Sequence, residues 1–217
     1  SLQDRRYFTT DFGYNMILLD RSMTSKSAEN LTLENRQKYE RDYVSHELFG
    51  DLMYRIHPKW SIGGGLRYTR VQELFDYDYQ IIEGNALKLI IKKRTLEHTN
   101  TMDLIDLYGQ VDYHFKLSNV RFTISNAIAY NTALNVKGLF LNETNTLDKL
   151  ENALFYKTNV GWSNQFSLGI HLPISDRISL GIRGGYRHYF NDWSNPDTNT
   201  EMRYHGFTVG SSVGYRF

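Results

Sequence analysis

The chain ends in the stretch HGFTVGSSVGYRF, residues 205–217, in which apolar and polar side chains alternate. One alternate set is mostly apolar and ends in two aromatic residues: His205, Phe207, Val209, Ser211, Val213, Tyr215 and Phe217. The other set is small or polar: Gly206, Thr208, Gly210, Ser212, Gly214 and Arg216. Because successive side chains of a β-strand point to opposite faces, this stretch predicts a final strand with one apolar face.

The same alternation recurs upstream and predicts about eight strands in all, the smallest closed membrane barrel. The predicted strands are 7–19, 43–56, 60–71, 102–115, 120–131, 156–172, 178–190 and 205–217. Short connections at 57–59, 116–119 and 173–176 alternate with long ones at 20–42, 72–101, 132–155 and 191–203. We therefore predict one all-β domain over residues 1–217, an antiparallel up-and-down transmembrane β-barrel with short periplasmic turns and long extracellular loops.

A soluble up-and-down barrel such as a lipocalin is the alternative, and there the apolar set would point inward. Three features favour a barrel whose outer face meets lipid. Small residues crowd the polar set, as a narrow lumen requires. Aromatic residues lie near both ends of the strands, as in the girdles of membrane barrels. Finally, charges of both signs fall on the polar set, where they can form a paired network in the lumen: Glu47, Asp51, Arg55, Arg67, Asp106, Asp112, Arg121, Arg183 and Arg187.

Bulk composition narrows the chemistry. The formal net charge of +1 indicates no polyanion, so we expect no nucleic-acid partner. The absence of cysteine excludes disulfides, thiolate metal sites and cysteine nucleophiles. No run approaches the roughly 18 apolar residues of a membrane helix. The chain opens at Ser1 without a charged and apolar leader, so we expect a signal peptide or a larger region before it in the full-length protein.

Three segments carry a family resemblance: WSIGGGLRY at 60–68, SDRISLG at 175–181 and VGYRF at 213–217. They resemble the Bacteroidetes-type outer-membrane β-barrel domain, over nearly the whole chain. The resemblance implies a bacterial outer-membrane location. It also implies that Phe217, with Tyr215 and Val213 before it, is the signal that the barrel-assembly machinery reads. Some members of that family stand alone, and others resemble the carboxy-terminal part of anti-sigma regulators.

Catalytic and metal sites are not indicated. A lumen of about eight strands is filled by side chains, so a pore is not expected. A lipid A deacylase would need a Ser–His pair on one strand face, but His46, His188 and His205 are each followed two residues later by an apolar residue. The loop 192–201 has oxygen ligands at alternate positions, yet it lacks the Gly and Glu of a calcium loop. We expect no cofactor.

Two long loops contain apolar residues without an obvious role. Those in 72–101 fit strands that continue above the membrane as a hairpin, and those in 144–155 have helical spacing. They would pack together as a lid or form a docking surface for a partner. The docking candidates are Ile81, Ile82, Leu89, Ile91, Leu147, Leu150 and Leu154.

The leading hypothesis is a non-enzymatic barrel that serves as a membrane anchor and as a binding, signalling or accessory component of an envelope complex. Its expected partners are outer-membrane lipid and lipopolysaccharide, the assembly machinery during insertion, and another envelope protein. One alternative is the carboxy-terminal outer-membrane sensor domain of an anti-sigma regulator. The other is an outer-membrane enzyme that modifies lipid A.

Overall fold

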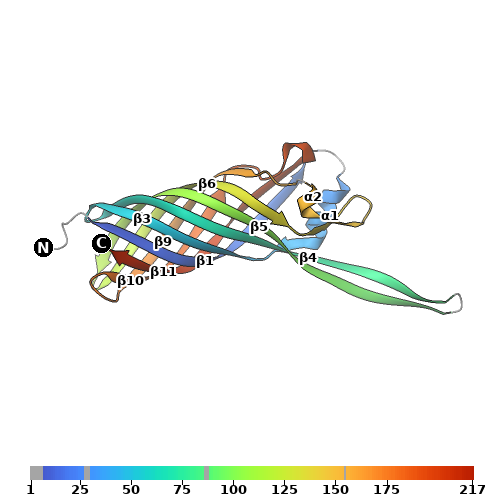
Figure 1. Ribbon diagram of the computed structural model, residues 1–217, viewed down its shortest axis with the longest axis horizontal. Helices are drawn as coiled ribbons and strands as arrows, with labels where there is room; N and C mark the ends of the chain where they lie inside the picture. The colour runs from blue at the N-terminus through green and yellow to red at the C-terminus, as the bar shows by residue number, and fades with distance from the viewer. Residues whose placement is uncertain (1–6, 27–29, 86–87, 154) are drawn as a thin grey trace.

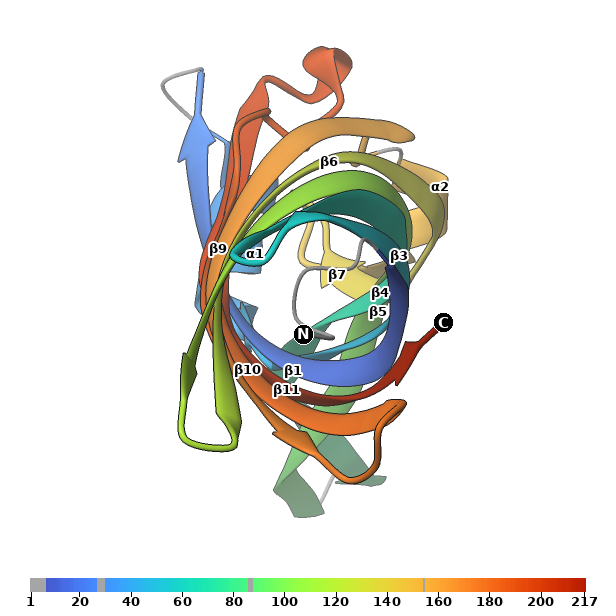
Figure 2. The same cartoon turned by 90° about the vertical axis from the view of Figure 1, so that its left-hand side faces the viewer.

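A computed structural model describes residues 7–26, 30–85, 88–153 and 155–217, and at 82–85, 88–90 and 153 it describes the backbone only. Eight antiparallel strands form a closed ring, seen end-on in Figure 2. The first and last of them pair, and the β4–β5 pair completes the ring. The ring strands are β1 (Phe8–Ser25), β3 (Val44–His57), β4 (Trp60–Asn85), β5 (Lys88–Leu117), β6 (Val120–Lys137), β9 (Asn159–Pro173), β10 (Ile178–Tyr189) and β11 (Thr200–Arg216).

The predicted barrel is confirmed, and its two ends differ as expected (Figure 1). Tight turns join β3 to β4, β5 to β6 and β9 to β10 at what we call the short-turn end. At the opposite, long-loop end β1, β4, β5, β6 and β11 run further than the alternation indicated. The hairpin expected in 72–101 is present, because β4 and β5 remain paired as far as Asn85 and Lys88. The sixth predicted strand begins at Asn159 instead of at 156.

Smaller elements cover the long-loop end: α1 (Leu31–Tyr39), β2 (Glu40–Asp42), β7 (Leu139–Leu141), β8 (Leu147–Lys149), α2 (Leu150–Ala153) and the 3₁₀ turn η2 (Pro196–Thr198). The prediction of a helix in 144–155, made from the spacing of its apolar residues, is largely wrong. Leu147 lies in β8, which pairs with β7, and helix forms only from Leu150 to Ala153. Leu154 lies outside the described residues. The helix α1 was not anticipated.

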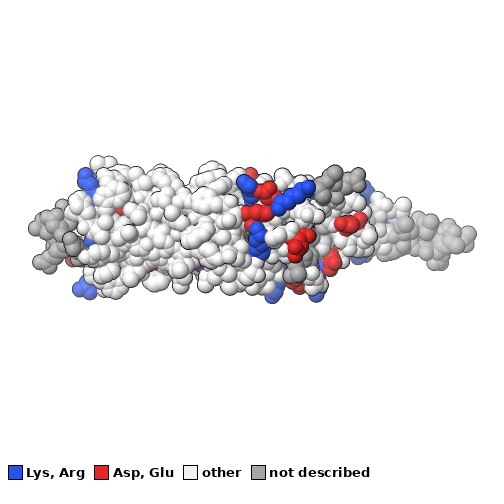
Figure 3. Space-filling model, turned by 90° about the horizontal axis from the view of Figure 1, so that it is seen from above, with Lys and Arg blue, Asp and Glu red and all other residues white. Residues whose placement is uncertain are grey.

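The apolar set of each strand faces outward. On β11, Phe207, Val209 and Val213 are all more than half exposed, whereas Thr208 and Ser212 are buried. Figure 3 shows the consequence on one face: a wide zone without Lys, Arg, Asp or Glu lies between charged groups at the two ends. A soluble barrel would have the opposite arrangement. The outer surface is therefore suited to lipid, and the polar set faces the lumen.

The lumen changes character along its length. Its middle is polar, but the half nearer the long-loop end contains an apolar core that includes Ile17, Leu104, Trp193 and Met202. None of the described helices is long and apolar enough to cross a membrane.

Candidate functional site

The centre of the lumen is an ion-pair network built on Glu47. Arg187 on β10 places a guanidinium nitrogen 2.6 Å from a carboxylate oxygen of Glu47 on β3, and both side chains are fully buried. Asn15 and Thr69, on the strands that flank β3, each donate a hydrogen bond to the same carboxylate, at 2.6 and 3.0 Å. A buried charge needs such compensation, so three neighbouring strands are tied together at this level.

A second carboxylate, Asp106 on β5, lies 3.9 Å from Arg187 and 3.9 Å from Arg67. Gln165 accepts hydrogen bonds from both guanidiniums. Arg67 also lies over the ring of Tyr108, at 4.2 Å from its centroid. A cavity of about 10 Å³ lies beside Glu47, Arg67 and Gln165, and one of about 20 Å³ lies nearer the short-turn end beside Asp112 and Arg183, so each has room for about one water. Side chains fill the middle of the barrel.

The predicted network residues separate into three groups. Glu47, Arg67, Asp106 and Arg187 meet in the centre, as described. Asp51, Asp112 and Arg183 lie nearer the short-turn end, where Tyr108 donates to Asp51 at 3.3 Å, Gln110 donates to Asp112 at 2.8 Å, and Arg183 covers the Phe49 ring at 3.5 Å. The remaining two, Arg55 and Arg121, belong to a separate cavity. The neutral Asn15 and Gln165 complete the centre, and the pattern of charges in the sequence does not identify them.

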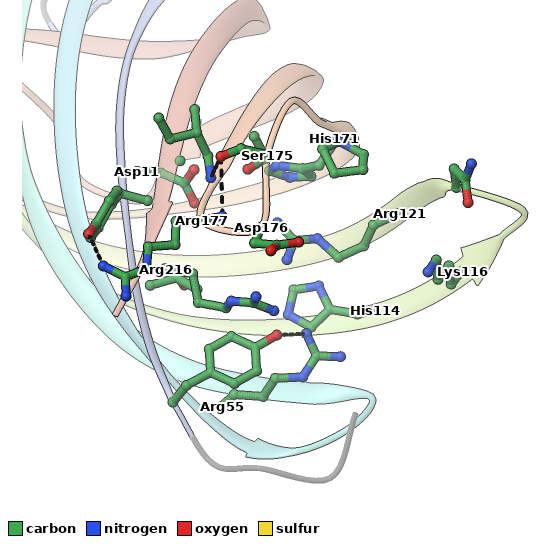
Figure 4. Close-up of a pocket in the computed structure, with 18 of the residues that line it drawn as sticks. Asp11, Arg55, His114, Lys116, Arg121, His171, Ser175, Asp176, Arg177 and Arg216 are labelled. Atoms are coloured by element: carbon green, nitrogen blue, oxygen red, sulfur yellow. Dashed lines mark hydrogen bonds between the residues drawn. The ribbon is translucent and has the colours of Figure 1, made fainter. Parts of the chain in front are cut away.

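That cavity opens at the short-turn end and has a volume of about 560 Å³; we call it the vestibule (Figure 4). Among the described residues, six cationic side chains line it, against two carboxylates. The cations are Arg55, Lys59, Lys116, Arg121, Arg177 and Arg216, and the carboxylates are Asp11 and Asp176.

A histidine in the vestibule wall has serine and threonine neighbours. The ring nitrogens of His114 lie 2.8 Å from Ser61 Oγ and 3.0 Å from Thr123 Oγ1. A serine nucleophile would need an acid to orient the histidine, and Thr123 occupies that position. Ser61 is buried and does not line the cavity. The arrangement satisfies the hydrogen bonds of a buried imidazole, which is a structural role.

Histidines on the outer face are not arranged as catalytic bases. His46 bonds the hydroxyl of Tyr14, His188 packs against Phe190, and His205 lies 3.8 Å from Asp20. Over the described residues, no cluster of three or more histidine and carboxylate side chains could hold a metal ion.

The long-loop end is closed by a buried charged cluster. Arg36 on α1 and Arg21 on β1 both bond Glu40, and Arg21 also reaches Glu73 at 2.6 Å. Burial alone would raise the pKa of Glu40, but the two guanidiniums outweigh it and hold that pKa below its usual range. Burial likewise opposes the charged form of Arg36, yet Glu40 raises the pKa of the guanidinium above its usual value. The cluster is therefore charged at neutral pH and anchors α1 over the barrel.

Aromatic packing completes this closure. Trp193, from the last long loop, is fully buried and stacks on Tyr204 with ring centroids 4.0 Å apart. Tyr189 meets the same indole edge-on at 4.7 Å. The hydroxyl of Tyr204 donates to Glu73, which joins the aromatic core to the charged cluster.

Beyond this closure the barrel continues as a two-stranded ribbon, residues 76–85 of β4 and 88–97 of β5 (Figure 1). Short β2 covers the edge of β4 only as far as Phe75, and β6 pairs with β5 only from Thr101. One face of the ribbon carries Tyr77 and Tyr79 opposite Leu96 and Arg94. The other face carries acidic residues and threonine, with Thr95 donating to Asp78 at 2.6 Å.

The predicted docking residues do not form one surface. Ile91 is exposed on the ribbon and Ile81 is half-buried, while the side chains of Ile82 and Leu89 lie outside the described residues. Leu147 is exposed on β8, but Leu150, the first residue of α2, is buried. Of the two interpretations, lid or docking surface, the lid accounts for the buried Leu150. The docking surface stays a prediction for the ribbon.

The three predicted assembly-signal residues share the outer face of β11 and its end. Val213, Tyr215 and Phe217 are exposed, and the rings of Tyr215 and Phe217 meet edge-on at 5.1 Å. The backbone of Phe217 donates to Phe8, which fixes the end of the chain against β1.

No protein-family model and no curated protein matches the sequence. Among solved structures, the chain is similar to neisserial surface protein A, with 12% identity, coverage of 98% of this chain and 97% of that chain, and a TM-score of 0.51. It is also similar to the outer membrane protein OprG from Pseudomonas aeruginosa, with 12% identity, 99% and 97% coverage, and a TM-score of 0.50. The chain thus has the fold of a small eight-stranded outer-membrane β-barrel protein.

Proposed function

We propose that the chain is a non-enzymatic protein of a bacterial outer membrane that presents the β4–β5 ribbon to another envelope protein. The ribbon is the observation that carries the proposal. A short loop would suffice to connect two barrel strands, yet β4 and β5 stay paired far beyond the closure. In the usual orientation of outer-membrane barrels, the short turns lie in the periplasm and the ribbon lies outside the cell.

The ribbon has the properties of a strand-addition site. Both of its edges lack a neighbouring strand among the described residues, so their backbone groups are available to another chain. Tyr79 adds an aromatic anchor of the kind enriched at protein interfaces, and it stacks on Tyr77, whose ring in turn packs edge-on against Tyr39 of α1. A two-stranded ribbon is only marginally stable alone, and a third strand from a partner would stabilise it.

The filled lumen also supports the proposal, because it argues against transport of a solute. The ion-pair network, the buried Trp193 and the charged cluster together leave no room for a solute path through the described part of the barrel. In the part of the chain that the structure describes, the side chains around His46, His114, His188 and His205 do not form a nucleophile–base–acid set. Lipid and lipopolysaccharide are proposed as the contacts of the outer face, and the assembly machinery as a transient partner of Phe217.

A photo-crosslinking residue in place of Tyr79 tests the proposal in intact cells. The matched control replaces Tyr186, a partly exposed tyrosine in the lipid-facing band. We expect one discrete crosslinked protein from position 79 and none from position 186. The absence of a product at position 79, or the same products from both positions, would contradict the proposal.

The two alternatives have their own tests. Removal or transfer of lipid A acyl chains by the purified protein, abolished by His46→Ala, would establish an enzyme instead. The resemblance to the Bacteroidetes-type family allows a sensor domain of an anti-sigma regulator. A reading frame that encodes a cytoplasmic helical domain and one membrane helix upstream would favour that role.

A further inference from the structure

The vestibule at the short-turn end has no part in the proposed binding by the ribbon, and its lining is unusual in charge. Among the described lining residues, the six cations exceed the two carboxylates by four charges. In the centre of the lumen, by contrast, Arg67 and Arg187 each lie within ion-pair distance of a carboxylate. Like charges gathered around one cavity are costly unless an anion joins them.

Two of these cations are held together by one aromatic ring. The guanidinium carbons of Arg55 and Arg216 each lie 5.4 Å from the centroid of the Tyr7 ring. The hydroxyl of Tyr7 also accepts a hydrogen bond from Arg55 at 2.8 Å. Tyr7 thus holds two like charges close together in the cavity lining, Arg55 from β3 and Arg216 from β11, both labelled in Figure 4.

A third cation of the vestibule, Arg121, is attracted by the carboxylates of Asp11 and Asp112 but forms no close ion pair with either. The Arg121 side chain is partly buried, and its Nε, like that of Arg55, is a buried donor without a hydrogen-bond partner. No ion pair connects its guanidinium to a carboxylate among the described residues, although Asp11 lines the same cavity. Buried donors are rarely left unsatisfied, so this one indicates a missing acceptor.

The chemistry of that acceptor follows from the donors. Guanidinium forks match the oxygens of phosphate and carboxylate. A phosphate group offers three or more oxygens, which can serve several converging guanidiniums at once, whereas a carboxylate offers two. The volume of about 560 Å³ also exceeds what a bare ion needs. We propose that the vestibule binds the phosphate group of a larger molecule, either a soluble phosphate ester or a phospholipid headgroup at the adjacent membrane surface.

Two probes distinguish the two sources. Glycerol 3-phosphate is titrated into the refolded full chain in neutral detergent by calorimetry. Phosphatidylglycerol is supplied in phosphatidylcholine nanodiscs, and lipid that remains bound is measured by native mass spectrometry. Saturable binding of the ester supports a soluble ligand, and selective retention of phosphatidylglycerol supports a lipid. The proposal would be overturned if neither phosphate probe bound. It would also be overturned if citrate bound while both phosphate probes did not.

Variants tie the binding to the vestibule. Arg121→Gln and, separately, Arg216→Gln should each weaken the phosphate interaction about tenfold or more, as loss of a hydrogen bond to a charged group does. Lys137→Gln is the matched control, because Lys137 is exposed at the opposite end of the barrel. Arg216 lies at the rim, so its variant remains informative if Arg121→Gln fails to refold. Equal binding by the control and both arginine variants would contradict the assignment.

Discussion

The variant Glu47→Gln tests the lumenal network most sharply. Glu47 and Arg187 form a fully buried pair at 2.6 Å, and Asp106 lies 3.9 Å from both Arg187 and Arg67. The substitution leaves two buried guanidiniums with one distant carboxylate. Removing one partner of a buried pair costs about 3–5 kcal/mol, and the remaining Asp106 places the expected loss near the lower limit, at about 3 kcal/mol.

Reversible urea unfolding in lipid vesicles, followed by tryptophan fluorescence, gives the free energy of unfolding. The control is Glu201→Gln, which removes a largely exposed pair with Arg203 and should cost less than about 1 kcal/mol. The double variant Glu47→Leu with Arg187→Met should recover most of the loss, because it removes both charges and leaves Arg67 with Asp106. If Glu47→Gln proves no more costly than the control, the network does not stabilise the barrel as described.

Three further predictions concern the two ends of the barrel. The pKa of Glu40 is lowered in the folded state, so its stabilising effect is present above the unfolded pKa of 4.5 and is lost as the pH falls through the folded pKa. An acid titration followed by Trp193 fluorescence should show this loss of stability, and Glu40→Gln should remove it. Trp193→Ala should cost about 3–5 kcal/mol in urea unfolding, because the indole is fully buried, and a loss below 1 kcal/mol would contradict its place in the core. Deletion of Phe217 should reduce the yield of assembled barrel in cells but leave refolding into detergent micelles nearly unchanged, whereas equal yields in cells would argue against an assembly signal.

The strands and their orientation could be predicted because period-two alternation reports which face is apolar. The stretch ending in Phe217 shows this: its apolar set is outward and its small set is inward. Alternation alone did not decide which set faces lipid. Charges of both signs on the same set as the glycines decided it, since a narrow lumen can pair them and lipid cannot.

The closed end could not be predicted from the same signal. Ile17 and Leu19 share the inward face of β1 with Asn15, so the lumen changes from polar to apolar along one strand. Alternation assigns a face but not the composition of the space that the face borders. Whether an inward residue meets charges or a plug depends on long-range packing of loops such as the one that carries Trp193.

The helix α1 was missed for a local reason. It has almost no amphipathic character, and its stability depends on Arg36 meeting Glu40 and Tyr156. A sequence signal was nevertheless present. Asn30 caps the helix by accepting from the backbone of Leu33, and Glu34 lies in its first turn, both of which are start signals.

The contact between the outer face of the barrel and lipid is the foundation of the whole account, and β11 allows a direct measurement of it. The natural chain has no cysteine, so single cysteines at 207–213 accept a nitroxide label without background. In lipid vesicles, paramagnetic resonance should show high oxygen accessibility at Phe207, Val209 and Val213 and low accessibility at Thr208 and Ser212. The reverse pattern, or uniform exposure to a water-soluble relaxant, would show that the apolar face does not meet lipid and would contradict the account.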